Sequence, residues 1–138
     1  MSGSPTEPAG ASGPRRVFPR TERLKKRADI RAAMKKGRCV TEYGAKLFYI
    51  RNNLSYNRIA FTFARKFGNA VERNRARRLG RESYRYMRAG LSVGWDFVLL
   101  VYPGERTGGA TFERRFRQLK ALVNRAGLGI GQMKTERA

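Results

Sequence analysis

Apolar residues recur with a helical period in three segments of the chain. The first covers residues 21–37, and the second runs from residue 69 to about residue 88. The third follows Thr111, which suits an N-cap, and stops before Gly127, which suits a helix end. The apolar side chains of this third helix fall within an arc of roughly 120°. They are Phe112, Phe116, Leu119, Leu122, Val123 and Ala126.

Three shorter segments have the composition of strands. Residues 45–52 and 58–64 are rich in aromatic and β-branched residues and are joined by turn-forming residues, so we expect an antiparallel pair. Residues 95–102 are almost wholly apolar, as is typical of a strand covered on both faces. The order of elements predicts an α/β or α+β layer fold. Its second strand, long helix and last strand can form a βαβ unit with parallel strands.

The length of 138 residues fits one domain with two tails. We expect a disordered tail at residues 1–18, which begins with a stretch rich in Pro, Gly and Ser, a domain at 19–126, and a flexible tail at 127–138. No membrane-spanning stretch and no signal peptide is recognisable. The single cysteine, Cys39, cannot form an internal disulfide, which fits a cytoplasmic protein. We expect its side chain to be semi-buried.

The charge is strongly lopsided. The chain holds 31 Lys and Arg against 10 Asp and Glu and has no His, which gives a net charge of +21. Such a chain repels itself unless a polyanion neutralises it, so nucleic acid is the first expected partner and an anionic membrane surface the second.

The same composition argues against a protein active site. Without His, the usual general base near neutral pH is missing. Asp29 and Asp96 are far apart in sequence and the eight glutamates are scattered, whereas a two-metal nuclease clusters its carboxylates. We therefore expect no catalytic residue and no metal site in the protein.

Residues 65–88 form the most informative segment, with nine basic residues against Glu72 and Glu82. On a helical wheel, one arc of roughly 140° holds Arg73, Asn74, Arg77, Arg78, Arg81, Tyr84, Arg85 and Arg88. The opposite side holds Val71, Ala76, Leu79, Ser83, Tyr86 and Met87. Guanidinium groups donate paired hydrogen bonds to phosphate. The segment therefore predicts a helix with one face for the core and one for nucleic acid, with a merely solvated charged face as the alternative.

Two further features leave alternatives open. Gly68 and Asn69 precede the basic helix, where backbone N–H groups could form an anion site or simply begin the helix. The aromatic residues on the expected strands are Phe48, Tyr49, Phe61, Phe63, Trp95, Phe97 and Tyr102. Most of them should belong to the core, and any that lie on the other face of the sheet could stack on unpaired bases.

The run K-F-G-N-A-V-x-R-N-R-x-R-R-x-x-R-E, from Lys66 to Glu82, resembles the Arg-Asn-Arg signature of the bacterial ribonuclease P protein subunit. Residues 23–38 are similar to that family's first helix and residues 95–98 to its last strand. The resemblance implies an α+β fold, an α-β sandwich that is ribosomal-protein-S5-like. Its order is helix-strand-strand-strand-helix-strand-helix, with a mixed sheet and a parallel β-α-β crossover that is left-handed in the family.

The resemblance also implies a function. In this family the catalytic RNA subunit removes the 5′ leader from precursor tRNA by metal-assisted hydrolysis, and the protein is its partner. The RNA-binding residues would be Arg65, Lys66, Arg73, Asn74, Arg75, Arg77, Arg78 and Arg81. The leader would run through a cleft between the first helix and the sheet, at Ile30, Met34, Lys46 and Phe48. Relatives often carry aromatic residues where this chain has Ile30 and Met34, and usually Lys where it has Arg77.

The expected partners are therefore the catalytic RNA and the precursor tRNA, with no membrane and no protein partner. The protein alone is expected to be non-catalytic and to bind no cofactor, with Mg²⁺ held in the holoenzyme through RNA. A ribosomal or other structural RNA-binding protein is the main alternative, because its size and charge would look similar. A protein-only nuclease is the third.

Overall fold

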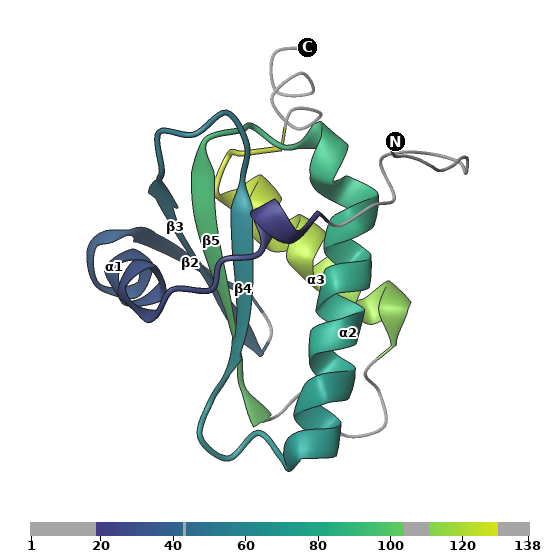
Figure 1. The fold of residues 1–138 in the computed structure, drawn as a ribbon. Helices are drawn as coiled ribbons and strands as arrows, with labels where there is room; N and C mark the ends of the chain where they lie inside the picture. Colours follow the sequence, from purple (N-terminus) through teal and green to yellow (C-terminus); the bar gives the residue numbers. More distant parts are fainter. Residues whose placement is uncertain (1–18, 43, 104–110, 130–138) are drawn as a thin grey trace, which may run out of the picture.

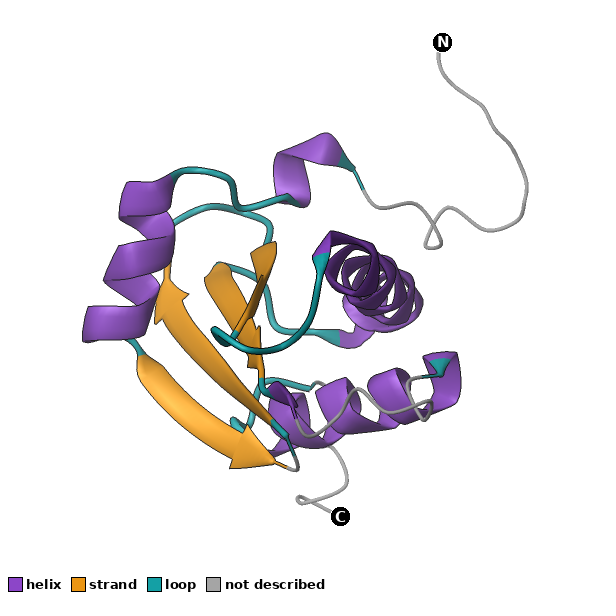
Figure 2. Cartoon of the chain, turned by 90° about the horizontal axis from the view of Figure 1, so that it is seen from below, coloured by secondary structure: helices purple, strands orange, loops and turns teal. Residues whose placement is uncertain are grey.

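The computed structural model describes residues 19–42, 44–103 and 111–129, which form three layers (Figures 1 and 2). One helix, α1, covers one face of a four-stranded sheet, and two helices, α2 and α3, cover the other. The elements in chain order are the 3-10 turn η2 (Arg20–Glu22), α1 (Arg27–Lys36), β2 (Arg38–Glu42), β3 (Ala45–Arg51), β4 (Arg58–Phe63), α2 (Ala70–Met87), the 3-10 turn η3 (Arg88–Gly90), β5 (Trp95–Val101) and α3 (Phe112–Arg125). The expected α+β class and element order are confirmed.

The strands lie in the order β2-β3-β5-β4. β5 runs parallel to β4, with Ile59 opposite Phe97, so the expected βαβ unit of β4, α2 and β5 is confirmed. β5 is also antiparallel to β3. The expected pairing of residues 45–52 with 58–64 is wrong, because β5 lies between those two strands.

The apolar character of β5 explains its central position. Phe97 and Leu99 point into a main core between the sheet and helices α2 and α3, and Val98 points into a smaller core under α1. All three are at most 1% exposed. A strand with apolar side chains on both faces needs a layer of helices over each face, and the centre of the sheet is where both layers cover it, so this requirement overrides the short turn that joins β3 to β4.

The start of the first helix also differs from the expectation. Residues 20–22 form η2, Arg23 and Lys26 are extended, and α1 begins only at Arg27. The Leu24 N–H donates to the Ile59 carbonyl at 2.9 Å, and its side chain is buried in the small core. Pairing with the edge of β4 therefore outcompetes helix formation, and the segment crosses that edge from the α2 side to the α1 side (Figure 1).

The pattern of the residues alone did not indicate β2, although the family order implied a strand there. β2 is short, polar and mostly exposed, so it lacks the apolar alternation of a half-buried strand. Cys39 lies on it and is exposed, not semi-buried as expected.

Helix α2 is rotated relative to the expected wheel. Gly80 marks its closest approach to the sheet, since a Cβ there would lie 2.6 Å from Cε1 of Phe61. The buried arc is accordingly centred near Gly80 and includes Tyr84, which is 1% exposed and not on the cationic face as expected. Val71 and Tyr86, expected in the core, are exposed.

Helix α3 follows the prediction closely. Thr111 accepts a hydrogen bond from the Arg114 N–H, and Gly127 takes a positive φ of 76° just after the helix. The domain continues past the expected boundary at residue 126, because Leu128 is buried and its carbonyl accepts from the Ser92 N–H at 2.8 Å. Residues 1–18, 43, 104–110 and 130–138, which include most of the expected tails, lie outside the described residues. No helix that the structure describes is long and apolar enough to cross a bilayer.

Candidate nucleic-acid interface

The signature residues of α2 divide into two groups. Asn74, Arg75 and Arg78 are exposed on the outer side of the helix, and Arg65 and Lys66 are exposed in the loop before it. These five residues form what we call the outer basic surface. A second group is half-buried on the flank of α2 that faces the edge of β4, namely Arg73, Arg77 and Arg81.

Arg73 braces the loop before the helix. Its Nε donates to the Gly68 carbonyl at 3.1 Å, and a terminal nitrogen lies 3.4 Å from the Arg65 carbonyl oxygen. Beside it, Asn69 and Glu72 form a capping box, in which the Glu72 carboxylate accepts from the Asn69 N–H at 3.0 Å. That carboxylate takes the place of an external anion, so the structure supports the simple helix start over the anion site.

Arg77 is held between an aromatic ring and a neighbour on the same helix. Its guanidinium carbon lies 5.2 Å from the centre of the Phe63 ring, and one terminal nitrogen donates to Asn74 Oδ1 at 3.0 Å. The Phe63 ring in turn packs against Phe67 with centroids 4.8 Å apart. The stack limits the rotamers of Arg77 and points its charge along the edge of β4.

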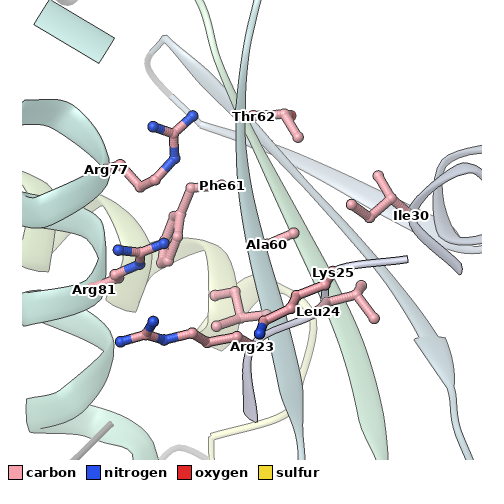
Figure 3. Close-up of a pocket in the computed structure, with 10 residues that line it drawn as sticks. Arg23, Leu24, Lys25, Ile30, Ala60, Phe61, Thr62, Arg77 and Arg81 are labelled. Atoms are coloured by element: carbon pink, nitrogen blue, oxygen red, sulfur yellow. The ribbon is translucent and has the colours of Figure 1, made fainter. Parts of the chain in front are cut away.

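A pocket of about 190 Å³ lies at this edge, and we call it the β4 groove (Figure 3). Arg77 and Arg81 reach it from α2, and Arg23 and Lys25 reach it from the segment that crosses β4. Its other lining residues are Leu24, Ile30, Ile59, Ala60, Phe61 and Thr62. The groove thus joins four cations to an apolar floor.

Arg81 is repelled by two other cations of the groove, Arg23 and Arg77. Burial, and to a smaller extent the charges of Arg23 and Arg77, lower the pKa of the Arg81 guanidinium, which still stays charged. Among the residues that the structure describes, no carboxylate lines the groove. The arrangement is stabilised when an anion binds between these side chains.

Two of the described carboxylates, Asp29 and Asp96, hold Arg58 away from the groove. Asp96 is buried and accepts two hydrogen bonds from Arg58, at 2.8 and 2.7 Å, while Asp29 lies 3.7 Å from the same guanidinium. The hydrogen bond to Asp96 is the main cause that raises the pKa of Arg58. These contacts fasten α1, β4 and β5 together, away from the groove.

Two arginines expected on the cationic face of α2 are paired with carboxylates. Arg85 lies 3.3 Å from Glu82, and Arg88 binds the buried Glu22. Both pairs reduce the free charge at the C-terminal end of α2. The cationic face is therefore shorter than the wheel predicted and is centred on Arg77 and Arg81.

The expected leader cleft is brought together only in part. Ile30 lines the β4 groove, and both it and Phe48 pack on the small core under α1. Met34, at 36% exposure, lies on α1 and Lys46 is half-buried on β3, and neither lines the groove.

Sequence reasoning missed Arg23 and Lys25 as site residues because it placed them on a helix. The signal that could have found them is Leu24, an apolar residue outside the stripe of the first helix, between two cations.

No group of three or more His, Cys, Asp and Glu side chains that could hold a metal ion occurs among the residues the structure describes. What the site offers is cationic and aromatic, on an α+β sandwich: the features of a protein that binds single-stranded or folded RNA.

Comparison with known proteins agrees with this class. The model of the Ribonuclease P family matches residues 18–127. The ribonuclease P protein component of Alkaliphilus metalliredigens is 40% identical over 81 residues, which are 59% of this chain and 73% of that protein. The component from Clostridioides difficile is 32% identical over 114 residues, 82% of this chain and 98% of that protein.

Solved structures show the same fold. The ribonuclease P protein of Thermotoga maritima has a TM-score of 0.69 and 26% identity, and the match covers 75% of this chain and 96% of that one. The Staphylococcus aureus protein has a TM-score of 0.70 and 23% identity, covering 78% and 97%. The chain belongs to the ribonuclease P protein family. Its function is that of a protein subunit of ribonuclease P, which acts on precursor tRNA, and not that of a ribosomal protein.

Proposed function

We propose that the outer basic surface of α2 contacts the catalytic RNA and that the β4 groove binds the 5′ leader of precursor tRNA. The observation that carries the second assignment is the meeting of Arg77 and Arg81 with Arg23 and Lys25 in a groove that none of the described carboxylates lines. Phosphates of an RNA strand would relieve the repulsion of Arg81 by Arg23 and Arg77.

The apolar floor of the groove suits an unpaired strand better than a duplex. Ile30, which is half-buried, offers apolar surface to a base, while the surrounding cations reach the phosphates. From Ile30 the leader would continue along α1 and β3 to Met34, Phe48 and Lys46. Such contacts combine backbone charge with apolar packing, so they carry little base preference.

Leader binding gives the protein its effect on the reaction. Mature tRNA has lost the segment that fills the groove, so the protein favours precursor over product. The chemistry belongs to the RNA subunit and to Mg²⁺ held by RNA, and the arginines of α2 would screen the phosphates of the two RNAs where they approach. We assign no catalytic residue, cofactor, membrane or further protein partner to this chain, and we place its action in the cytoplasm.

A series of leader lengths tests this function. The holoenzyme reconstituted with catalytic RNA is titrated with mature tRNA and with precursors whose leaders grow one nucleotide at a time. Affinity should rise over the first several nucleotides and then level off, once the groove and the α1 surface are filled. Equal affinity for precursor and mature tRNA would overturn the leader assignment.

The same preparation separates a protein subunit from a protein-only nuclease. Purified protein is incubated with precursor tRNA and Mg²⁺, with and without the RNA subunit. Cleavage should require the RNA subunit, and cleavage by the protein alone would refute the assignment of the chemistry to RNA.

A further inference from the structure

A buried carboxylate fastens the N-terminal turn to the far end of α2. Glu22 is 6% exposed, and its Oε1 accepts a hydrogen bond from Arg88 Nε at 2.9 Å. The second carboxylate oxygen pairs with a terminal nitrogen of Arg88, and the Tyr84 hydroxyl lies 3.4 Å from Oε1. Burial, followed by the charge of Glu22, raises the pKa of Tyr84, so its hydroxyl stays protonated and can donate. Glu22, Arg88 and Tyr84 therefore form a buried cluster in which the carboxylate charge is balanced by the guanidinium.

The residues that follow Glu22 form one wall of the β4 groove. Arg23 bridges to Ile59 on the edge of β4, and the Leu24 N–H donates to the Ile59 carbonyl. The buried Leu24 side chain fixes the other side of the segment under α1. The segment is thus held at Glu22 and at Leu24. Between them, the Arg23 side chain points toward α2, and both Arg23 and Lys25 line the groove (Figure 3).

This wall stands against electrostatic repulsion. Arg23 lies close enough to Arg81 for its charge to contribute to the lowered pKa of that guanidinium. Without RNA, the repulsion favours movement of the extended segment away from α2. Glu22 holds the segment on the α2 side, one residue before the first cation of the wall.

We infer that Glu22 is a positioning residue for RNA binding: through Arg88 and Tyr84 it holds Arg23 and Lys25 opposite Arg77 and Arg81. This inference rests on the proposed function, because it assumes that the β4 groove binds the leader. Glu22 itself touches no RNA in this arrangement. Its removal should therefore act only through the two cations of the wall.

A double-mutant cycle tests this dependence. The full-length variants are Glu22→Gln, the pair Arg23→Ala/Lys25→Ala, and all three changes together, each reconstituted with catalytic RNA. The readout is affinity for a leader-bearing precursor and for mature tRNA, at a temperature where every variant is folded. Glu22→Gln should weaken precursor binding about tenfold, the loss of roughly one charge-assisted contact. In the Arg23→Ala/Lys25→Ala background, the same change should have less than a twofold effect.

Asp96→Asn is the matched control, because it also removes a buried carboxylate that binds an arginine, here Arg58. Both substitutions should lower the midpoint of thermal unfolding, but only Glu22→Gln should lower the affinity for precursor. Comparable losses of affinity in the two variants would show that stability alone is responsible and would overturn the inference.

The remaining outcomes separate the inference from the proposed function. If Arg77→Ala/Arg81→Ala weakens precursor binding while Arg23→Ala/Lys25→Ala and Glu22→Gln do not, the groove still binds leader but the positioning role is refuted. If Glu22→Gln costs the same affinity in both backgrounds, it acts by another route and the inference also fails. If none of these variants changes precursor binding relative to mature tRNA, the proposed function and the inference fall together.

Discussion

Helices α2 and α3 pack side by side on the same face of the sheet, and each begins with a side-chain cap and carries several arginines (Figure 1). They use those arginines differently. On α3, Arg117 is exposed, Arg125 pairs with Glu42 at 3.2 Å, and the buried Arg115 binds Gln118. None of the basic residues of α3 lines the β4 groove.

On α2, the half-buried arginines meet cations from a distant part of the chain. Arg77 and Arg81 face Arg23 and Lys25, which are more than fifty positions away in sequence. The number of charges on a helix therefore does not define a binding site. A binding site arises where a second basic segment converges on the same groove, and here the two segments converge at the edge of β4.

The largest difference between the helices should appear in stability. Leu122 of α3 is fully buried in the main core. Leu122→Ala should lower the free energy of unfolding by about 2–5 kcal/mol, since it leaves a cavity in a packed interior. Urea denaturation measures this loss, and the fraction that stays folded should still bind precursor normally. By contrast, Arg77→Ala/Arg81→Ala should cause no comparable loss of unfolding free energy. A loss of similar size would mean that these two arginines contribute to the core.

The second difference should appear in binding. Arg77→Ala/Arg81→Ala removes two cations from α2, and Arg117→Ala/Arg125→Ala removes two from α3 and serves as the charge-matched control. We expect the first pair to weaken holoenzyme binding to precursor by about tenfold to a hundredfold, because charge-assisted contacts are lost. The control should change it less than twofold. Equal effects would mean that net charge, and not the groove, governs binding.

The salt dependence of binding sharpens the same contrast. Neutralising one phosphate of a single strand contributes about 0.7 to the slope of log K against log salt concentration. The slope for precursor binding should therefore become shallower by about 1.4 in Arg77→Ala/Arg81→Ala. It should stay unchanged in the α3 control. An unchanged slope in the α2 variant would exclude direct phosphate contact by these two arginines.

The smallest difference concerns the two helix caps. Asn69 shares a capping box of two hydrogen bonds with Glu72, whereas Thr111 accepts one bond, at 3.2 Å. Removing a cap costs about 1 kcal/mol on average. Thermal unfolding should show a larger loss for Asn69→Ala/Glu72→Ala, which removes both bonds of the box, than for Thr111→Ala, which removes one. The reverse order would mean that the box contributes less than the geometry implies.

Sequence patterns predicted the elements well where residues close in sequence determine the structure. The apolar run of β5 and the stripe and cap of α3 are set by neighbouring residues, and both were placed within a residue or two. The signature from Lys66 to Glu82 was sufficient to identify the family.

The errors arose where distant residues compete with local preference. Leu24 leaves the helical pattern because the edge of β4 offers it a hydrogen bond and a buried site. Tyr84 is buried because Gly80 sets the closest approach of α2, and a wheel drawn from charges cannot include that contact. Glu22 and Arg88 are 66 positions apart, so no local pattern indicates their pairing.

Cross-linking from the β4 groove tests whether the 5′ leader lies there. Cys39 is exposed and would react with the same reagent, so all variants carry Cys39→Ser. A photoreactive group is then attached at Thr62→Cys in the groove or, as the control, at Arg117→Cys on α3. In the holoenzyme with precursor tRNA, the group at position 62 should cross-link to leader nucleotides and the group at 117 should not. Cross-links from position 62 to the body of mature tRNA, or leader cross-links from position 117 alone, would contradict the account.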